Sequence, residues 1–171
     1  MPCLYFMACR NSGQKATSQL EDPGALKESL VRANQHVVGT EDEQIRNLVN
    51  RYGWQMKETG TGLRYLIYHK GNGQNAETGD MANIHYEVRL ITGDIVYSSQ
   101  ESGIKKFRIG SGGVESGLEE GILLLHQGDK AKMILPSHLA WGLIGDQNKI
   151  PPKSTLIYDL ELISLEKQIK K

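Results

Sequence analysis

The stretch from Val114 to Leu125, VESGLEEGILLL, carries the signals of a short helix between extended segments. Ser116 can cap its first turn, and Glu119, three residues later, can reach back to close a capping box. Three apolar side chains fall at helical spacing on one face: Leu118, Ile122 and Leu125. Gly128 lies where a left-handed terminator is expected. Because a helix this short is not stable alone, the rest of the chain must cover it.

Composition limits the classes of protein to which this chain can belong. Its 171 residues can bury the core of one ordinary domain, with sequence left over for an extension. The 20 basic and 20 acidic residues cancel, so no overall field attracts nucleic acid or an acidic membrane. We therefore expect one domain with an extension, and no nucleic-acid partner.

Both cysteines, Cys3 and Cys9, lie in the first ten residues, so the body of the protein has neither an internal disulfide nor a cysteine metal cluster. Met7-Ala8-Cys9 loosely resembles the junction at which bacterial lipoprotein signals are cut and the cysteine is acylated. Two alternatives stay open: a lipid anchor at Cys9, or a soluble protein whose disordered start carries incidental thiols. Residues 1–21 are interpreted as a targeting remnant and a flexible tether.

Residues 22–58 predict a helical extension. Asp22-Pro23 begins a helix that ends near Gly39. A second capping box, formed by Thr40 and Glu43, predicts another helix directly afterwards. Since this helical pair is too small to hold a core of its own, it must pack on the body, on a partner, or on its copy in a homodimer.

Extended segments make up most of the remaining chain. The clearest is 83–90, in which apolar and polar residues alternate strictly. Further strands are predicted at 63–68, 95–98, 106–109, 130–135 and 155–163. Strands joined by turns, with a single helix among them, indicate an antiparallel α+β domain. The long segment 136–153 is typical of a functional loop.

Several motifs, in matching order and spacing, resemble the FKBP-type peptidyl-prolyl isomerases from about Gly62 to Leu165. They include Ile84-His85-Tyr86, Phe107-Arg108-Ile109-Gly110, Gly117-Leu118-Glu119-Glu120-Gly121, Ala140-Trp141-Gly142 and Ile150-Pro151-Pro152. The resemblance implies an FKBP-like domain over residues 59–171, with an antiparallel sheet wrapped around the short central helix. The VESGLEEGI segment is most similar to that of gliding-motility-associated FKBP lipoproteins, which also carry helices before the isomerase domain.

The resemblance implies a peptidyl-prolyl cis-trans isomerase that assists protein folding in the periplasm or cell envelope, without a cofactor or a metal. Rotation about an Xaa-Pro peptide breaks no bond, so the site needs only to bind the twisted amide better than the planar one. The implied partners are proline-containing polypeptides, together with macrolide inhibitors of the FK506 and rapamycin kind. The alternative hypothesis is a proline-binding chaperone or assembly module with little or no isomerase activity.

The resemblance also implies a proline pocket between the helix and the sheet. The residues that it assigns to catalysis are Tyr86, Tyr97, Ser98, Trp141 and Tyr158. The residues that it assigns to substrate binding are Phe107, Val114, Glu115, Leu118 and Ile150. Leu118 is expected to form the floor and Trp141 the rim, and the backbone N–H of Glu115 to donate to a substrate carbonyl.

Two departures from the family pattern bear on this pocket. Leu118 stands where the family usually has Trp, which predicts an aliphatic floor and a roomier pocket. The family's aromatic-acid pair matches Val96-Tyr97 or, with one inserted residue, Tyr97-Ser98, and neither match supplies the acid. We place Tyr97 in the wall, with Ser98 as its polar neighbour. The missing acid calls full activity and macrolide affinity into question.

Overall fold

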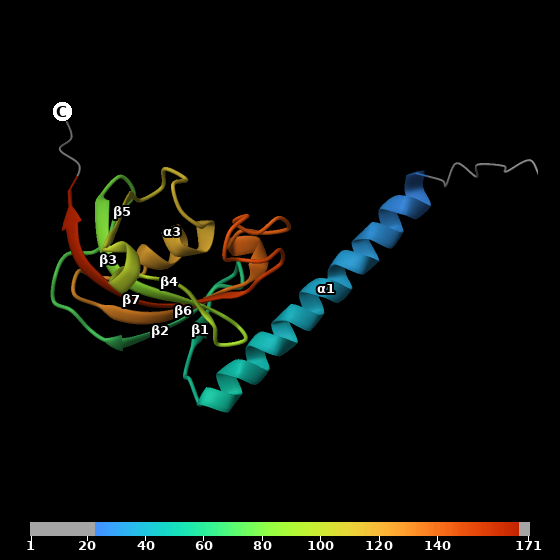
Figure 1. Ribbon diagram of the computed structural model, residues 1–171, viewed down its shortest axis with the longest axis horizontal. Coiled ribbons are helices and arrows are strands. Elements are labelled where there is room, and N and C mark those ends of the chain that lie inside the picture. Colours follow the sequence, from blue (N-terminus) through green and yellow to red (C-terminus); the bar gives the residue numbers. More distant parts are fainter. Residues whose placement is uncertain (1–22, 168–171) are drawn as a thin grey trace, which may run out of the picture. The chain divides into compact units, whose positions relative to one another are not determined.

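The structure is a computed structural model in which residues 23–167 are described (Figure 1). Its chain divides into two compact units, Met1–His36 and Val37–Lys171. Cys9 and the predicted tether lie outside the described residues. The candidate site and nearly all of the secondary structure belong to the second unit.

The predicted extension forms one helix rather than two. Helix α1 runs unbroken over Pro23–Tyr52, through the expected end at Gly39 and the expected start at Thr40. An interior glycine costs only about 1 kcal/mol, which the flanking helical turns can outweigh. Salt bridges at i,i+4 spacing support those turns on both sides of the glycine: Arg32 with Glu28, and Arg46 with Asp42.

A seven-stranded antiparallel sheet forms the body, which confirms the α+β prediction (Figure 1). Its strands are β1 (Lys57–Glu58), β2 (Arg64–His69), β3 (Met81–Leu90), β4 (Ile95–Ser98), β5 (Lys105–Arg108), β6 (Lys130–Leu135) and β7 (Leu156–Glu166). The order is β1-β2-β6-β7-β3-β4, and β5 pairs with the first half of β3 while β4 pairs with its second half. The short helix α2 (Ser99–Ser102) separates these two half-strands.

Helix α3 (Ser116–Ile122) lies against the sheet, as the sequence predicted, but its first turn differs from the prediction. Glu115, not Ser116, occupies the N-cap position, and no side chain caps the helix. The Ser116 hydroxyl instead donates to the backbone carbonyl of Leu139, and Glu119 accepts from the N–H of Gly112. The expected capping box is therefore absent, because both side chains bond to neighbouring loops.

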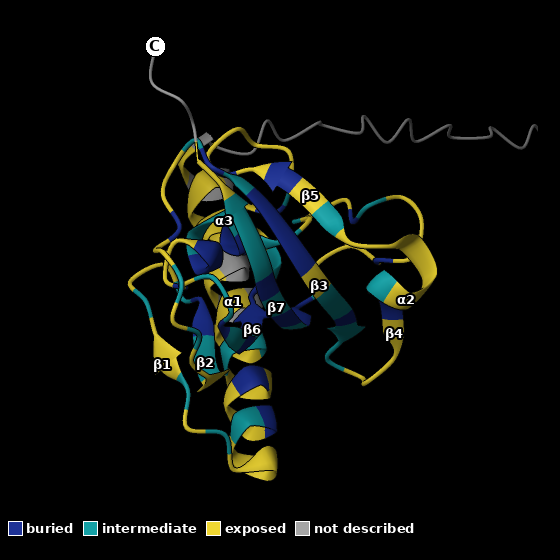
Figure 2. Ribbon diagram, turned by 90° about the vertical axis from the view of Figure 1, so that its left-hand side faces the viewer, coloured by how far each residue is buried: buried dark blue, intermediate teal, exposed yellow. Residues whose placement is uncertain are grey.

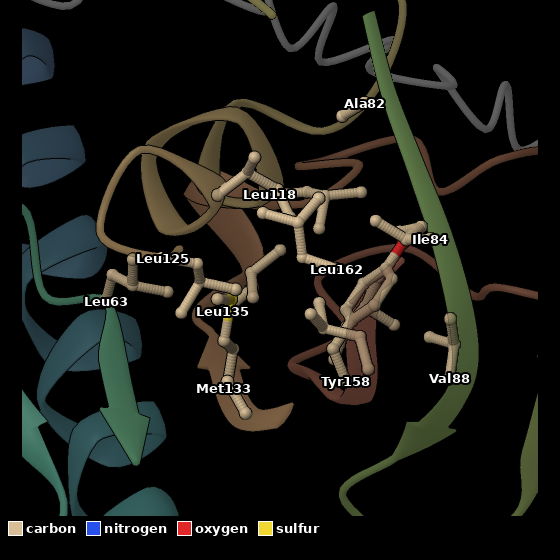
Figure 3. Packing of buried hydrophobic residues seen from close by; sticks show 14 of the residues in the cluster. Leu63, Ala82, Ile84, Val88, Leu118, Leu125, Met133, Leu135, Tyr158 and Leu162 are labelled. Atoms are coloured by element: carbon tan, nitrogen blue, oxygen red, sulfur yellow. The ribbon is translucent and has the colours of Figure 1, made fainter. Parts of the chain in front are cut away.

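The core lies between α3 and one face of the sheet. Leu118 and Ile122 of α3 are fully buried there, as is Leu125 just beyond it. Figure 3 shows Leu118 and Leu125 packed with side chains from three strands, among them Leu135, Tyr158 and Ile84. Every strand that the sequence predicted contributes to one continuous hydrophobic cluster or packs against it.

The opposite face of the sheet is covered by the C-terminal half of α1. Ile45 and Leu48 are buried against Ile134 of β6 and Ile157 of β7, which are partners in the strand register. The buried positions on this half of the helix are drawn dark blue in Figure 2. Successive residues of a strand face opposite sides of the sheet. Strands β6 and β7 carry apolar residues on both sides, so one face packs against α3 and the other against α1.

Polar contacts secure this half of α1 to the sheet and to the long loop. Glu41 accepts from the backbone N–H and the hydroxyl of Ser137, and from the hydroxyl of Thr155. Asp42 forms a salt bridge with the buried Arg64. The hydrogen bond and charge of Arg64 hold the pKa of Asp42 below its usual value, although burial opposes this.

Candidate functional site

The structure brings most of the predicted site residues into one packed group. Phe107, Leu118, Ile150 and Tyr158 are members of the buried cluster. Tyr86, Tyr97 and Val114 are partly buried and pack against it. They come from four strands, the start of α3 and the loop before β7, so the fold gathers residues that are far apart in the sequence.

The carboxylate of Glu115 joins this group to the predicted rim. Its Oε1 atom accepts a hydrogen bond of 2.7 Å from the hydroxyl of Tyr158 and one of 3.0 Å from the indole N–H of Trp141. Tyr158 is completely buried, whereas Trp141 is 43% exposed. The three side chains therefore link the interior of the core to the surface through a single carboxylate oxygen.

Burial sets the protonation state of Tyr158. Desolvation, followed by the nearby charge and the hydrogen bond of Glu115, raises the pKa of the Tyr158 hydroxyl well above its usual value. The hydroxyl thus stays protonated at every physiological pH and remains a donor to Glu115.

Lys105 approaches the same group from β5. Its Nζ atom lies 3.9 Å from Oε2 of Glu115, 5.0 Å from the ring centre of Tyr86 and 5.9 Å from that of Tyr158. These distances allow cation–π attraction to both rings. The side chain of Lys105 is 27% exposed, so the ammonium group reaches the site from its solvent side.

The long loop after β6 is fastened to the site by Asp146. One carboxylate oxygen accepts the backbone N–H groups of Asn148 and Ile150, at 2.9 and 2.7 Å. The other accepts the hydroxyl of Tyr97 on β4. This contact raises the pKa of Tyr97, with burial as the second cause. Asp146 thereby positions both Tyr97 and Ile150, two of the predicted site residues.

The serines after Tyr97 have different surroundings. Ser98, the predicted polar neighbour of Tyr97, is buried at the end of β4. Ser99, to which the sequence assigned no role, forms two hydrogen bonds with β3 through its hydroxyl. It accepts from the N–H of Tyr86 at 2.6 Å and donates to the carbonyl of Tyr86 at 3.0 Å. Ser99 therefore fixes the backbone of a predicted wall residue.

Besides the hydroxyl of Ser99, sequence reasoning missed three polar side chains of the site: the carboxylates of Glu115 and Asp146, and the ammonium group of Lys105. Only the backbone of Glu115 was assigned a role. An N-cap residue lies outside the helical period, so no pattern indicates where its side chain points. The contact of Asp146 with Tyr97 spans 49 residues and depends on the tertiary fold.

Two hollows of the molecule differ in how they relate to this group. One of about 510 Å³ is lined by Tyr86 and Ser98, together with residues of β7. Another of about 640 Å³ is lined by residues of β2 and of the turn before β6, among them Tyr65, Ile67 and His126, and contains none of the predicted site residues. Within residues 23–167, no group of three or more His, Cys, Asp or Glu side chains could hold a metal ion. The site itself presents oriented donors, a carboxylate and apolar walls.

Comparison with known proteins identifies the class to which this fold and site belong. Residues 72–163, more than half of the chain, match the family described as FKBP-type peptidyl-prolyl cis-trans isomerase. The chain belongs to this family.

Particular members show the extent of the similarity. FK506-binding protein 2 of Yarrowia lipolytica is 42% identical over 94 residues, which cover 54% of this chain and 65% of that protein. A probable FKBP-type isomerase of Neisseria meningitidis serogroup B, FkpA, is 35% identical over 111 residues, 64% of this chain and 40% of that protein. The crystal structure of FkpA from Escherichia coli superposes with a TM-score of 0.66 at 28% identity, covering 84% of this chain and 67% of that one. The chain thus spans less than two thirds of the length of both sequence relatives.

Proposed function

We propose that the protein is a peptidyl-prolyl cis-trans isomerase that accelerates rotation of Xaa-Pro bonds without covalent chemistry or a cofactor. The main support is the packing of Tyr86, Phe107, Leu118 and Tyr158 into one group between α3 and the sheet, in a chain of the FKBP-type family. This group presents aromatic and aliphatic surface of the kind that suits a proline ring.

The chemistry of the reaction is consistent with these residues. Rotation about the peptide bond faces a barrier of about 18 to 20 kcal/mol, because the amide loses its resonance when it is twisted. A catalyst lowers this barrier by binding the twisted form more tightly than either planar form. Apolar walls exclude the water that favours the more dipolar planar amide, and the backbone N–H of Glu115, which donates no hydrogen bond within residues 23–167, can hold the substrate carbonyl.

A direct test measures the cis-to-trans exchange rate of an Xaa-Pro peptide by NMR, with and without protein. Uncatalysed exchange takes tens to hundreds of seconds, so catalysis is easily resolved. Exchange that stays at the uncatalysed rate at stoichiometric protein would rule out the proposed activity.

Replacement of Tyr158 locates the site. Tyr158→Ala should abolish both turnover and peptide binding, because it removes the ring and the donor to Glu115. The change also costs about 3 to 5 kcal/mol of stability, so a control with a similar defect is needed. Ile157 precedes Tyr158 on β7 and is buried on the opposite face of the sheet. The control variant Ile157→Ala should retain turnover at a temperature where both variants are folded. Normal turnover by Tyr158→Ala would mean that the site lies elsewhere.

A chaperone function is the second candidate, and the tip of the long loop favours it. Leu143 and Ile144 are 72% and 68% exposed, next to the partly exposed Trp141. Exposed apolar side chains of this kind can hold unfolded chains. Binding of a proline peptide without catalysis, together with suppressed aggregation of an unfolded protein that is lost in a Leu143→Ser/Ile144→Ser variant, would favour this function.

We further propose an extracytoplasmic setting in which Cys9 carries a lipid anchor, as in gliding-motility-associated FKBP lipoproteins. The Met7-Ala8-Cys9 junction supports this proposal. No helix within residues 23–167 is long and apolar enough to span a membrane. Labelling with a radioactive fatty acid, compared between wild type and Cys9→Ser, tests the anchor.

Two interactions complete the proposal. Exposed Leu30, Val31 and Val38 on α1 support association of two copies through this helix, and sedimentation equilibrium would detect the dimer.

Macrolides of the FK506 kind are proposed as ligands of the site. Calorimetric titration with FK506 tests this, and no heat at micromolar protein would contradict it.

A further inference from the structure

One oxygen of the Glu115 carboxylate has no hydrogen-bond partner, although it is buried. The side chain is only 3% exposed, and Oε2 is the one buried side-chain nitrogen or oxygen within residues 23–167 that lacks a partner. An ionised carboxylate can accept about four hydrogen bonds, and here Oε1 takes both that are formed. A buried acceptor without a donor costs free energy, so the site favours any ligand that supplies one.

The surroundings hold this oxygen in place. The hydroxyl of Tyr158 and the indole N–H of Trp141 both bond to Oε1, one from the core and one from the rim, and together restrict rotation of the carboxylate. Lys105 is the nearest cation, but its Nζ lies 3.9 Å from Oε2, beyond the 2.7 to 3.2 Å of an N–H···O hydrogen bond. The ammonium group balances the charge without forming a hydrogen bond to Oε2, so a donor that takes the place of Lys105 can come closer.

We propose that the Glu115 carboxylate determines substrate specificity: its Oε2 atom accepts a hydrogen bond from an N–H donor of the bound peptide beside the proline. The inference rests on the proposed isomerase function. It assigns the side chain of Glu115 a role distinct from that of its backbone N–H. The family's acid is missing from β4, and Glu115 at the start of α3 provides a carboxylate to the site instead.

The donor must come from a residue next to the proline. Proline itself has no backbone N–H, so the nearest amide donor is that of the following residue. A lysine before the proline is the other source, because its ammonium group can replace the distant Lys105. A hydrogen bond to a charged acceptor in a dry site is strong enough to discriminate between substrates.

Two pairs of peptides distinguish these sources. In the first pair, the amide after proline is either ordinary or N-methylated. In the second pair, the residue before proline is lysine or norleucine. Wild-type protein should prefer the donor-bearing member of one pair by about tenfold or more in kcat/KM.

Glu115→Gln removes the acceptor while keeping the shape. The glutamine oxygen can still accept from Tyr158 and Trp141, and its NH₂ group replaces Oε2 with a donor. The preference should then shrink to within about twofold, a change that a purely structural role would not produce. Glu43→Gln removes the same charge at an exposed position of α1 and should keep the wild-type preference. Thermal unfolding of each variant confirms that it is folded.

The outcomes distinguish a failure of the isomerase function from a failure of the role proposed for Glu115. Wild-type protein that shows no turnover of any peptide would overturn the isomerase function itself. Turnover without a preference in either pair, or with the same preference in wild type and Glu115→Gln, would overturn only the role of Glu115.

Discussion

Asp146 shows how a single carboxylate can organise a long loop. It closes the turn before Ile150 through two backbone N–H groups and joins that turn to β4 through the hydroxyl of Tyr97. Burial alone would raise its pKa, but the hydrogen bonds from Tyr97 and from the backbone of Ile150 and Asn148 outweigh burial. The pKa of Asp146 is therefore held below its usual value.

The lowered pKa of Asp146 predicts acid sensitivity of the fold. Because its pKa is lower in the folded than in the unfolded chain, Asp146 contributes stability that is fully present above the unfolded value of about 3.9 and is lost as the pH falls through the folded value. The free energy of unfolding, measured in urea between about pH 7 and pH 3, should decrease less for Asp146→Asn than for wild type.

Asp94→Asn provides the control for this measurement. Asp94 is exposed, and its carboxylate accepts a hydrogen bond only from the hydroxyl of the neighbouring Thr92 among the described residues. Its replacement should leave the acid dependence of the wild type unchanged. If Asp146→Asn and wild type had parallel pH profiles, the hydrogen bonds of Asp146 would contribute nothing to folding.

At the scale of single residues, the sequence predicted which side chains are buried better than it predicted which side chains form hydrogen bonds. Alternation along 83–90 correctly places Ile84 and Val88 in the core, because the strand period is a local property. Leu118 and Tyr158, which the family resemblance assigned to one pocket, lie in the same buried cluster. The inward carboxylate of Glu115 follows no period. Its partners come from β7 and the long loop, so only the three-dimensional fold reveals it.

At the scale of elements, the close approach of α3 to β6 depends on glycine. Gly117 and Gly121 stand one turn apart on the face of α3 that meets the strand. A Cβ atom at Gly117 would lie 2.7 Å from Cγ of Leu135, closer than real Cβ atoms come. The helix can therefore lie on the sheet, with Leu118 in the core, because these two positions have no side chain.

Gly117→Ala should destabilise the protein, although alanine favours helices. The gain in helix propensity is at most about 1 kcal/mol, whereas overpacking a core costs about 1 to 3 kcal/mol. We expect a net loss of about 1 kcal/mol in urea denaturation. Gly39→Ala in α1 is the matched control, because nothing lies within 4 Å of its Cβ position, and it should gain up to about 1 kcal/mol. A more stable Gly117→Ala would show that Leu135 can move aside freely.

Helix α1 continues through a position where the sequence predicted a break. The sequence predicted a break at Gly39 and Thr40, since glycine ends many helices and threonine begins many. Both residues nevertheless lie inside the helix. From Glu41 onward, hydrogen bonds to Ser137 and Thr155 and a salt bridge to Arg64 hold the helix on the sheet. Together with the flanking helical turns, these tertiary contacts outweigh a local signal worth about 1 kcal/mol.

At the scale of the whole molecule, the sheet has a helix on each face. Helix α3 covers the face that carries Met133 and Tyr158, and the C-terminal half of α1 covers the face that carries Ile134 and Ile157. The predicted domain boundary at residue 59 would leave this second face without its helix. From the contacts of Ile45 and Leu48 we propose that the folding unit begins near Val37, the first residue of the second compact unit.

Two truncations test this boundary. A chain that starts at Val37 keeps the contacts of Glu41, Asp42, Ile45 and Leu48 with the sheet and the long loop, so its free energy of unfolding should match that of the full chain within about 1 kcal/mol. A chain that starts at residue 59 exposes Ile134 and Ile157 and deprives the buried Arg64 of its partners Asp42 and Glu58. It should lose about 4 kcal/mol or more, since burial of Ile45 and Leu48 contributes on the order of 2 kcal/mol each. Equal stability of the two truncated chains would show that α1 is an appendage and that the domain begins at residue 59, as the sequence predicted.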